Sequence, residues 1–398
     1  MRDVIVFAVV FGALPFALLR PFQGLLLFTW LAYMRAPDLS WGAARSFRFS
    51  LIVGAIMFLG WFLFDNRPFM RKDRRNFFMI MLAVCVTTSY FVFAEVQTPT
   101  TTAKAIEFMK VIAVALFTTG QLDSKTRVRT LLLVMTLSFA FYGVKGGIWG
   151  LLLQDAKIIR GPGGLLLDNN DFSLAMVMNI PFLYYMAFTE PSKRMRQFMR
   201  AAVFLTVITV VLTGSRGGFL SMAVVFFVIV LKSKYKRYAL PGSALGGLLF
   251  LAFIPDHYRE RIASIGSAAT EDASAMGRLR AWRVAGEMIK ANPFFGVGFQ
   301  NFVFRYQEYD PYAEKTVVRV AHNSYFQIWA ETGSFSFFFF LSTMFSSVIL
   351  MRRLQRVNRV RAGPRWISDY ASIIEVSLYG FMVGAMFLNR GHFDFMYQ

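Results

Sequence analysis

Apolar residues along this chain come in long blocks, and many of these blocks contain no charged side chain. A soluble core would show a period of 3.6 or 2.0 residues with a polar face, whereas these blocks are apolar on all sides. Such blocks are typical of helices that span a bilayer. They predict an all-α, polytopic integral membrane protein with about twelve transmembrane helices. The expected spans are residues 4–19, 22–34, 49–64, 77–94, 105–119, 130–149, 172–189, 199–213, 217–231, 239–254, 335–351 and 371–388.

One polar segment of a different kind, residues 255–321, interrupts the apolar blocks. It is nearly neutral and as rich in charge as a soluble domain, and its stretch SAMGRLRAWRVAGEMIKANP predicts a helix that Pro293 stops. Long structured loops on one face of a membrane protein often carry function. We therefore expect N-terminal transmembrane helices over 1–254, a long loop over 255–322 and C-terminal transmembrane helices over 323–398.

The basic side chains report orientation in the membrane. The chain is 56% hydrophobic, has a mean hydropathy of +0.48 and carries a formal net charge of +20. A protein that binds nucleic acid would gather this charge into a binding surface. Here nearly all of the excess lies at predicted helix ends, where Lys and Arg mark the cytoplasmic side. The basic segments are residues 65–76, 121–129, 190–200, 232–237 and 352–365. The distribution argues for membrane lipids and against nucleic acid as partners.

With these segments in the cytoplasm, the remaining connections face outside, namely residues 95–104, 150–171, 213–218 and 255–322. The orientation of the N-terminus stays open, because two crossings before residue 35 place it outside and one broken crossing places it inside. We expect the apolar N-terminus to be retained, since it has no A-x-A-like cleavage site. A truncated and a naturally short C-terminus are both open.

Several kinds of chemistry have no motif in this chain. Three histidines and the single cysteine, Cys85, do not make a typical zinc site or an internal disulfide. There is no H-E-x-x-H, no P-loop and no G-x-S-x-G motif. No cluster of aspartates suggests Mg²⁺ binding. We therefore expect any catalysis to proceed without a metal or another cofactor.

Arg216 lies in LTGSRGGFL, a turn between two predicted spans on the outside. The neighbouring glycines leave room for a ligand near the backbone, and a guanidinium matches the oxygens of a phosphate. Thr213 or Ser215 could cap the next helix and leave its N–H groups directed at an anion. The alternative is an interfacial arginine that contacts lipid phosphates.

The stretch GRLRAWR supplies three further cations, Arg278, Arg280 and Arg283. On a helix Arg280 and Arg283 share a face, whereas Arg278 shares its face with Trp282. All three are candidates for binding phosphate groups. The alternative is a solvated helix face whose arginines pair with acidic neighbours, Glu271, Asp272 and Glu287.

His322, in the stretch VAHNSYFQIWAETG, is the candidate base. An imidazole with a pKa of about 6.5 accepts a proton at neutral pH and returns it. Asn323 and Tyr325 are polar neighbours, and Glu331 follows too far along the chain to share the same helical turn. The alternative is a histidine that caps a helix at the membrane interface.

Two further groups of polar residues precede or lie within predicted spans on the outside. Asp168, Asn169 and Asn170 precede a span and could cap its helix or bind substrate. Lys145, in YGVKGG, lies near the outer end of its predicted helix. An ionisable residue there is a functional candidate, with snorkelling to the interface as the alternative.

The motifs LTGSRGG (212–218), GRLRAW followed by NPFFGVGFQNF (277–302), and AHNSYFQIWAETG (321–333) occur in that order. In this order they resemble the O-antigen ligase and polymerase superfamily of bacterial inner membranes, over nearly the whole chain. Three other stretches resemble a narrower branch, the O-glycosylation ligases found with exosortase systems. They are LRPFQGLLLFTWLAYM (19–34), FYGVKGG (141–147) and DNNDFSLAMVMNIP (168–181).

The resemblance implies transfer of a glycan from an undecaprenyl pyrophosphate carrier to a hydroxyl of a glycan, lipid or protein. It makes residues 255–322 a periplasmic catalytic loop and implies an inverting, metal-independent reaction. It implies His322 as the base and Arg216 and Arg278 as catalytic arginines, with Arg280 as the rival for the second arginine. The candidates for substrate binding are then Arg280, Arg283, Lys145, Asp168, Asn170, Asn323 and Tyr325.

Two other functions stay open on the sequence. A glycan polymerase of the same superfamily differs only in its acceptor, which the sequence does not specify. A transporter or flippase for a lipid-linked glycan would also be polytopic, with arginines near phosphates. Transporters often contain inverted repeats, and no repeat is visible in this sequence.

Overall fold

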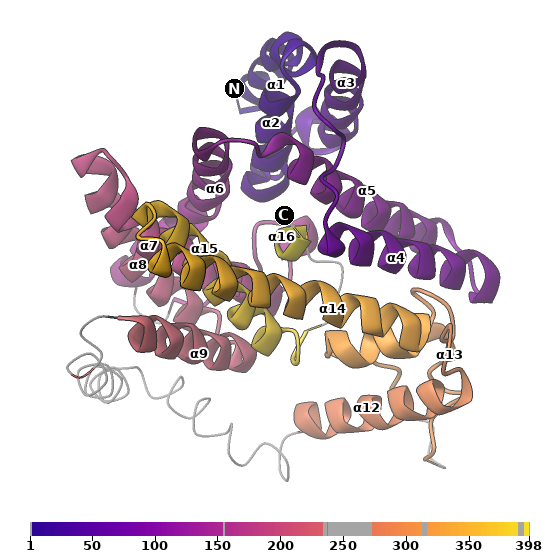
Figure 1. Ribbon diagram of the computed structural model, residues 1–398. Helices are drawn as coiled ribbons and strands as arrows, with labels where there is room; N and C mark the ends of the chain where they lie inside the picture. The colour runs from indigo at the N-terminus through magenta and orange to yellow at the C-terminus, as the bar shows by residue number, and fades with distance from the viewer. Residues whose placement is uncertain are drawn as a thin grey trace. The chain divides into compact units, whose positions relative to one another are not determined.

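The computed structural model describes residues 2–153, 156–233, 237, 273–312, 317–388 and 394–397 (Figure 1). Within these residues the regular structure is helical, and the one β-pairing is an isolated bridge between Arg160 and Asp168. The expected all-α class is therefore confirmed. The chain divides into two compact units. The first is Met1–Arg71 with Val114–Thr213, and the second is Lys72–Ala113 with Gly214–Gln398.

The first unit contains two groups of packed helices, α1–α2–α3 and α6–α7–α8. Helix α6 approaches α8 closely because Gly147 has no side chain; a Cβ there would lie 2.3 Å from the carbonyl oxygen of Leu205. The helices are α1 (Arg2–Leu19), α2 (Pro21–Met34), α3 (Phe49–Phe64), α6 (Lys125–Leu152), α7 (Asn169–Thr189) and α8 (Lys193–Leu212). Short 3-10 turns are η1 (Ala36–Leu39), η2 (Ala43–Arg45) and η4 (Gly164–Leu166).

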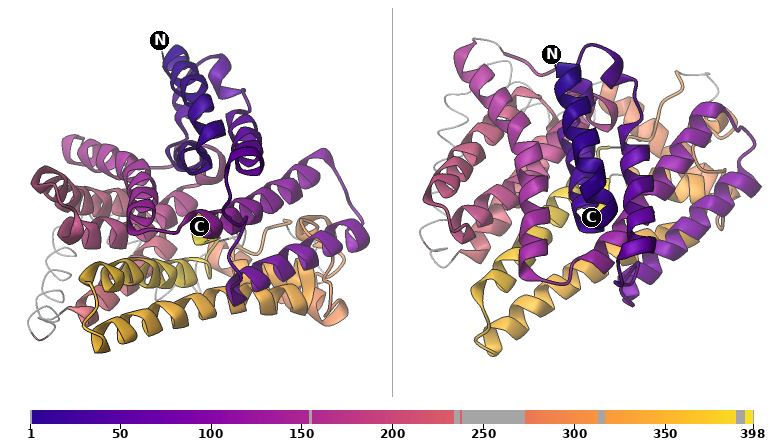
Figure 2. Two further views of the ribbon diagram at one scale, coloured as in Figure 1. Left: turned by 45° about the horizontal axis from the view of Figure 1, so that its top comes forward. Right: turned by 90° about the horizontal axis from the view of Figure 1, so that it is seen from above.

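The second unit is organised around the long helix α14 (Ser324–Val360), which packs against α4 (Arg74–Thr88) and α15 (Arg365–Gly384) (Figure 2). Helix α4 continues into a π-helical turn, η3 (Ser89–Phe93). Helix α9 (Arg216–Lys232) packs on α15, and α12 (Ala273–Ala291) packs on α14. The short helices are α13 (Phe302–Arg305) and α16 (Asp394–Tyr397), and α5 (Pro99–Gln121) begins in this unit and ends in the first.

Helix α14 bends at Gly333, whose backbone is not helical, with φ 78° and ψ −179°. A Cβ at Gly333 would lie 2.0 Å from the carbonyl oxygen of Phe294, so the bend brings α14 against the segment after α12. The N–H of Ser334 donates to the carbonyl of Pro293 at 2.8 Å. The bend therefore separates a short first part of α14, which follows His322, from the long remainder.

A buried carboxylate fastens the opposite part of α14 to its neighbours. The side chain of Glu375, on α15, is 2% exposed. It accepts hydrogen bonds from Lys232 of α9 at 2.5 Å and from Arg352 and Gln355 of α14 at 3.0 and 2.7 Å. A buried charge requires such partners, and these hold three helices together.

Six helical segments of the described residues are long and apolar enough to span a membrane: α1, α4 with η3, α6, α7, α8 and α14. Helix α3 is apolar but shorter. The expected spans 22–34, 105–119, 217–231 and 371–388 coincide with helices α2, α5, α9 and α15, which do not meet both conditions. Residues 239–254 lie outside the described residues. A multi-pass α-helical protein is thus supported, but the count of about twelve spans is not confirmed.

Candidate active site

His322 directly precedes the N-cap of α14 and is half-buried. Its φ of 47° is a left-handed conformation, uncommon for residues other than glycine. The next residue, Asn323, provides the cap, because its side-chain oxygen accepts hydrogen bonds from the N–H groups of Tyr325 and Phe326, at 3.0 and 3.2 Å. The cap is therefore the amide of Asn323 and not the imidazole. This leaves the imidazole next to a fixed helix start.

The residue before His322, Ala321, is fully buried and is held by α12. The indole N–H of Trp282 donates to the Ala321 carbonyl at 2.8 Å. The same ring stacks on Phe326, with centroids 5.8 Å apart. Arg278 lies one helical turn before Trp282 on the same face of α12. The face that carries Arg278 is therefore the face attached to the segment of His322.

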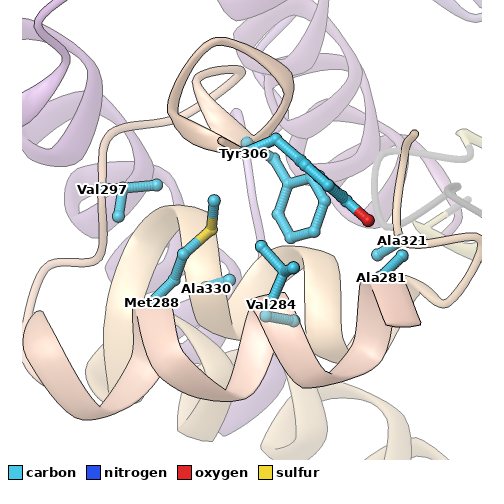
Figure 3. Packing of buried hydrophobic residues seen from close by; sticks show 9 residues of the cluster. Ala281, Val284, Met288, Val297, Tyr306, Ala321 and Ala330 are labelled. Atoms are coloured by element: carbon cyan, nitrogen blue, oxygen red, sulfur yellow. The ribbon is translucent and has the colours of Figure 1, made fainter. Parts of the chain in front are cut away.

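A hydrophobic cluster lies beneath this attachment (Figure 3). Figure 3 shows Val284 and Met288 of α12 directed toward Tyr306, with Val297 and Ala330 close by. Burial raises the pKa of the Tyr306 hydroxyl, so this side chain stays neutral in the cluster. The full cluster is Ala281, Val284, Ala285, Met288, Val297, Phe302, Tyr306, Ala321 and Ala330. It joins α12, the segment after α12 and the first part of α14 into one packed body.

The start of α14 is also tied to the end of α15. The N–H of Ser324 donates to the Ala385 carbonyl at 2.8 Å, and the hydroxyl of Ser324 donates to the Leu388 carbonyl at 2.6 Å. The hydroxyl of Tyr325 donates to the Met382 carbonyl at 2.8 Å. The predicted polar neighbours of His322 thus have structural partners: Asn323 caps the helix and Tyr325 fastens it to α15.

Arg216 is the first residue of α9 and is half-buried. The turn before it needs Gly214, whose φ is 60°. Ser215, one of the two expected caps, caps the helix, because its hydroxyl accepts a hydrogen bond from the N–H of Gly218 at 3.1 Å. A Cβ at Gly217 would lie 2.8 Å from the Cβ of Phe387. The start of α9 therefore lies against the stretch that follows α15.

The segments of Arg216, His322 and Arg278 are connected through two sets of contacts. Gly217, next to Arg216, contacts Phe387, and Ser324, close after His322, bonds to the adjacent Leu388. The segment of His322 is joined to the helix of Arg278 by the bond from Trp282. All of these residues belong to the second unit. These contacts thus link the segments that contain Arg216, His322 and Arg278.

Arg280, the rival second arginine, points to a different partner. Its guanidinium forms an ion pair with Asp310, with N–O distances of 3.2 and 3.3 Å, and the Asp310 side chain is 5% exposed. The guanidinium also lies 4.1 Å from the centre of the Tyr312 ring. Arg283, which is exposed, donates to the Tyr312 hydroxyl at 2.5 Å. Arg280 and Arg283 thus order the segment at 310–312.

The alternative pairing proposed for this arginine cluster is wrong where the structure describes it. Glu287 pairs with Lys290 at 2.7 Å and not with the arginines. Glu271 and Asp272 lie outside the described residues. Arg280 pairs instead with Asp310, thirty residues further along the chain.

The remaining candidates, Asp168, Asn170 and Lys145, belong to the first unit. Asp168 caps α7, accepting hydrogen bonds from the backbone and side-chain amides of Asn170 at 2.8 and 3.0 Å. Asn169 donates to the carbonyl of Thr213 at 2.9 Å. Lys145 is exposed and lines a cavity of 350 Å³ with Arg2 and apolar residues of α1 and α2. Capping is thus a role that the described contacts give to Asp168.

Glu331 is a buried residue whose contacts the sequence did not predict. It is 3% exposed, and its carboxylate binds the backbone of the segment after α12. In the sequence, Glu331 is notable only as an acidic residue too far from His322 to share its helical turn. The glycines Gly296, Gly298 and Gly333, all with positive φ, are the one signal that could have predicted this close packing.

The fold and the site indicate a multi-pass α-helical membrane protein in which Arg216 and His322 lie at the starts of α9 and α14, and Arg278 lies on α12, which packs on α14. Residues 201–341 match the family described as O-antigen ligase, and this match supports the resemblance to the O-antigen ligase and polymerase superfamily. Residues 1–156 match a second family, described as a family of unknown function. A search of the curated proteins found no match.

Proposed function

We propose that this protein is a glycosyltransferase that moves a glycan from an undecaprenyl pyrophosphate carrier to an acceptor hydroxyl. The match to the O-antigen ligase family carries the proposal, because the matched range contains Arg216, Arg278 and His322. The predicted cytoplasmic side of the basic helix ends supports a reaction on the opposite, periplasmic face of the bacterial inner membrane.

In the proposed reaction the acceptor oxygen attacks the anomeric carbon of the donor sugar. The bond from that carbon to the pyrophosphate oxygen breaks, and undecaprenyl pyrophosphate leaves with the bonding electrons. A single displacement of this kind inverts the anomeric carbon. His322 takes the acceptor proton, a contribution of roughly 10²–10⁴-fold in rate.

Negative charge grows on the departing pyrophosphate, and the role of Arg216 and Arg278 is to stabilise it. A fixed cation at a developing charge, in a site that excludes water, contributes about 3 kcal/mol. A guanidinium suits this task because its fork matches two phosphate oxygens. The position of Arg216 at the N-terminus of α9 adds the helix dipole to its own charge.

The contacts of α12 favour Arg278 over Arg280 as the second arginine. Arg280 is engaged with the buried carboxylate of Asp310 and the ring of Tyr312. Arg278 lies on the face of α12 that Trp282 fastens to the segment of His322. We therefore assign the pyrophosphate to Arg278 and a structural role to Arg280.

The test is glycan transfer by the purified protein in lipid nanodiscs, with undecaprenyl pyrophosphate-linked glycan as donor and EDTA present. Three acceptors are offered separately: lipid A core sugars, glycan oligomers, and peptides with Ser and Thr. Wild type transfers, and His322→Ala loses about 100-fold or more in kcat at equal membrane insertion. His257→Ala, which changes the other histidine of residues 255–322, is the comparison variant and loses less kcat than His322→Ala. Full activity in His322→Ala would remove the base from the mechanism.

The arginine assignment has its own comparison. Arg278→Lys keeps the charge but loses the fork, and it lowers kcat more than thermal stability. Arg280→Lys lowers thermal stability more than kcat. The reverse result would exchange the two roles.

The acceptor panel separates the remaining functions. Transfer to glycan oligomers alone identifies a polymerase, and transfer to peptides identifies an O-glycosylation ligase. Movement of the labelled carrier across vesicles by wild type, without transfer to any acceptor, would replace the proposal with a flippase.

A further inference from the structure

Glu331 is a buried carboxylate that the proposed reaction does not use. It lies two residues before the bend of α14 and is 3% exposed. One carboxylate oxygen accepts a hydrogen bond from the N–H of Gln300 at 3.0 Å, and the other from the N–H of Phe302 at 3.3 Å. The side-chain amide of Gln327 also donates to this carboxylate. Each oxygen therefore receives at least one N–H, which matches the two acceptor oxygens of a carboxylate.

The backbone around Glu331 binds the same segment. The carbonyl of Glu331 accepts the N–H of Gly298, and that of Ala330 accepts the N–H of Val297, both at 2.9 Å. The hydroxyl of Ser89, in η3, donates to the Glu331 carbonyl at 2.8 Å. A Cβ at Gly296 would lie 2.3 Å from the Glu331 backbone, so the backbones of these two segments are in direct contact. We call residues 293–302 the docking loop.

The docking loop connects directly to α12, which ends at Ala291. Helix α12 is thus attached to the first part of α14 at two places. Near its middle, Trp282 bonds to Ala321, and after its end the docking loop binds Glu331. The packed cluster of Figure 3 fills the space between these two attachments. Two attachments and a packed core fix the position of α12 along α14, and with it the position of Arg278.

We propose that Glu331 is a positioning residue that sets the placement of Arg278 relative to His322. This role rests on the transfer reaction proposed above. Glu331 does not touch the reacting atoms; it acts by fixing the docking loop, and through the loop the helix that carries Arg278. A misplacement of about 1 Å at a reacting centre costs roughly 100-fold in rate. A residue that does not touch the reacting atoms can therefore affect the rate by fixing the position of Arg278.

A carboxylate fits this place better than an amide of the same shape. Glu331→Gln offers one acceptor oxygen, so one of the two backbone N–H groups, of Gln300 or Phe302, would face the new NH₂ group. Two donors facing each other in a buried site repel, and one buried N–H loses its partner. The volume of the side chain is unchanged, so the effect falls on the docking loop and not on the cluster.

The activity test compares Glu331→Gln with Glu375→Gln, in the transfer assay described above. Glu375 is an equally buried carboxylate of the same unit, bonded to α14 and to Lys232, which lies at the end of α9 opposite Arg216, instead of the docking loop. Glu331→Gln lowers kcat by roughly 10- to 100-fold and leaves KM for the donor within about twofold. Glu375→Gln lowers thermal stability but keeps kcat per folded molecule. Equal losses of kcat in both variants would overturn the proposal.

The position of α12 is measured separately, by the distance between spin labels at Leu279 and Phe338. Both residues are exposed, at 41% and 59%, and lie on α12 and on α14 beyond the bend. The labels are placed as cysteines in a Cys85→Ser chain. Glu331→Gln shifts or broadens the distance distribution, and Glu375→Gln does not.

An unchanged distribution in Glu331→Gln, or a changed one with wild-type kcat, would overturn the positioning role. The distance needs no substrate, so it decides how Glu331 acts on α12 even if the wild-type chain transfers no glycan. In that case the proposed function fails, and the distance alone decides whether Glu331 fixes the position of α12.

Discussion

The bend of α14 provides a sharp test of how the docking loop is held, through the substitution Gly333→Ala. Gly333 has φ 78° and ψ −179°, a region of backbone conformation that is essentially restricted to glycine. A Cβ at this position would also lie 2.0 Å from the Phe294 carbonyl oxygen. That oxygen belongs to the backbone and has no rotamer to change. Alanine therefore strains α14 and also displaces the docking loop.

The magnitude follows from these two effects. The unfavourable backbone conformation costs about 2 kcal/mol. Displacement of the docking loop breaks three backbone hydrogen bonds of 2.8–2.9 Å, which join Pro293, Val297 and Gly298 to α14. Each contributes about 1 kcal/mol. Gly333→Ala should therefore lower the free energy of unfolding by about 5 kcal/mol, among the largest losses from a single substitution.

The assay uses Cys85, the single cysteine, which is partly buried on α4, a helix that packs against α14. Its reaction with a maleimide in mixed micelles reports unfolding. Gly286→Ala is the control, because Gly286 lies within α12 and a Cβ there meets nothing within 4 Å. That substitution should stabilise the chain by about 0.5–1 kcal/mol. A loss below about 1 kcal/mol in Gly333→Ala would refute the argument that the bend and the docking loop are mutually fixed.

Two other substitutions test the attachments of α12. Trp282→Phe removes the donor to Ala321 but keeps a ring to stack on Phe326; it should cost about 1–3 kcal/mol, because a buried carbonyl loses its partner. Chemical unfolding beside wild type measures this loss, and an unchanged stability would contradict it. Asp310→Asn leaves Arg280 without its buried counter-charge and should cost about 3 kcal/mol. Thermal unfolding measures that cost, which should disappear in the double variant with Arg280→Met, and a persistent cost would contradict the pairing.

Much of the helical arrangement follows from the sequence, for a simple physical reason. A segment inside a bilayer must satisfy its own backbone groups, so a long apolar block has little choice except a helix. The blocks therefore predicted α1, α6, α7 and α8 closely. Cap and stop signals were equally local: Asp168 caps α7, and α12 ends before Pro293. The number of spans could not be predicted in the same way, because several other apolar blocks form helices that are short or carry charged residues.

The contacts within the candidate site could not be predicted in the same way. Arg280 pairs with Asp310 and not with an acidic residue of its own helix, because the chain returns to α12 after the docking loop. Glu331 binds backbone N–H groups, and an N–H is present at nearly every residue, so no residue type marks these partners in the sequence.

Two of the motifs quoted from the sequence turn out to be halves of one contact. The loop NPFFGVGFQNF docks through Gly296 and Gly298 onto the ETG of α14, where Glu331 and Gly333 receive it. Their residue types are explained by packing: glycines permit the close approach, and the carboxylate accepts hydrogen bonds from the N–H groups of Gln300 and Phe302. A resemblance that rests on these two stretches is therefore evidence of similar packing, and not by itself of the same chemistry. The proposed chemistry is assigned to residues outside this contact, Arg278 and His322, and this is why their variants decide the function.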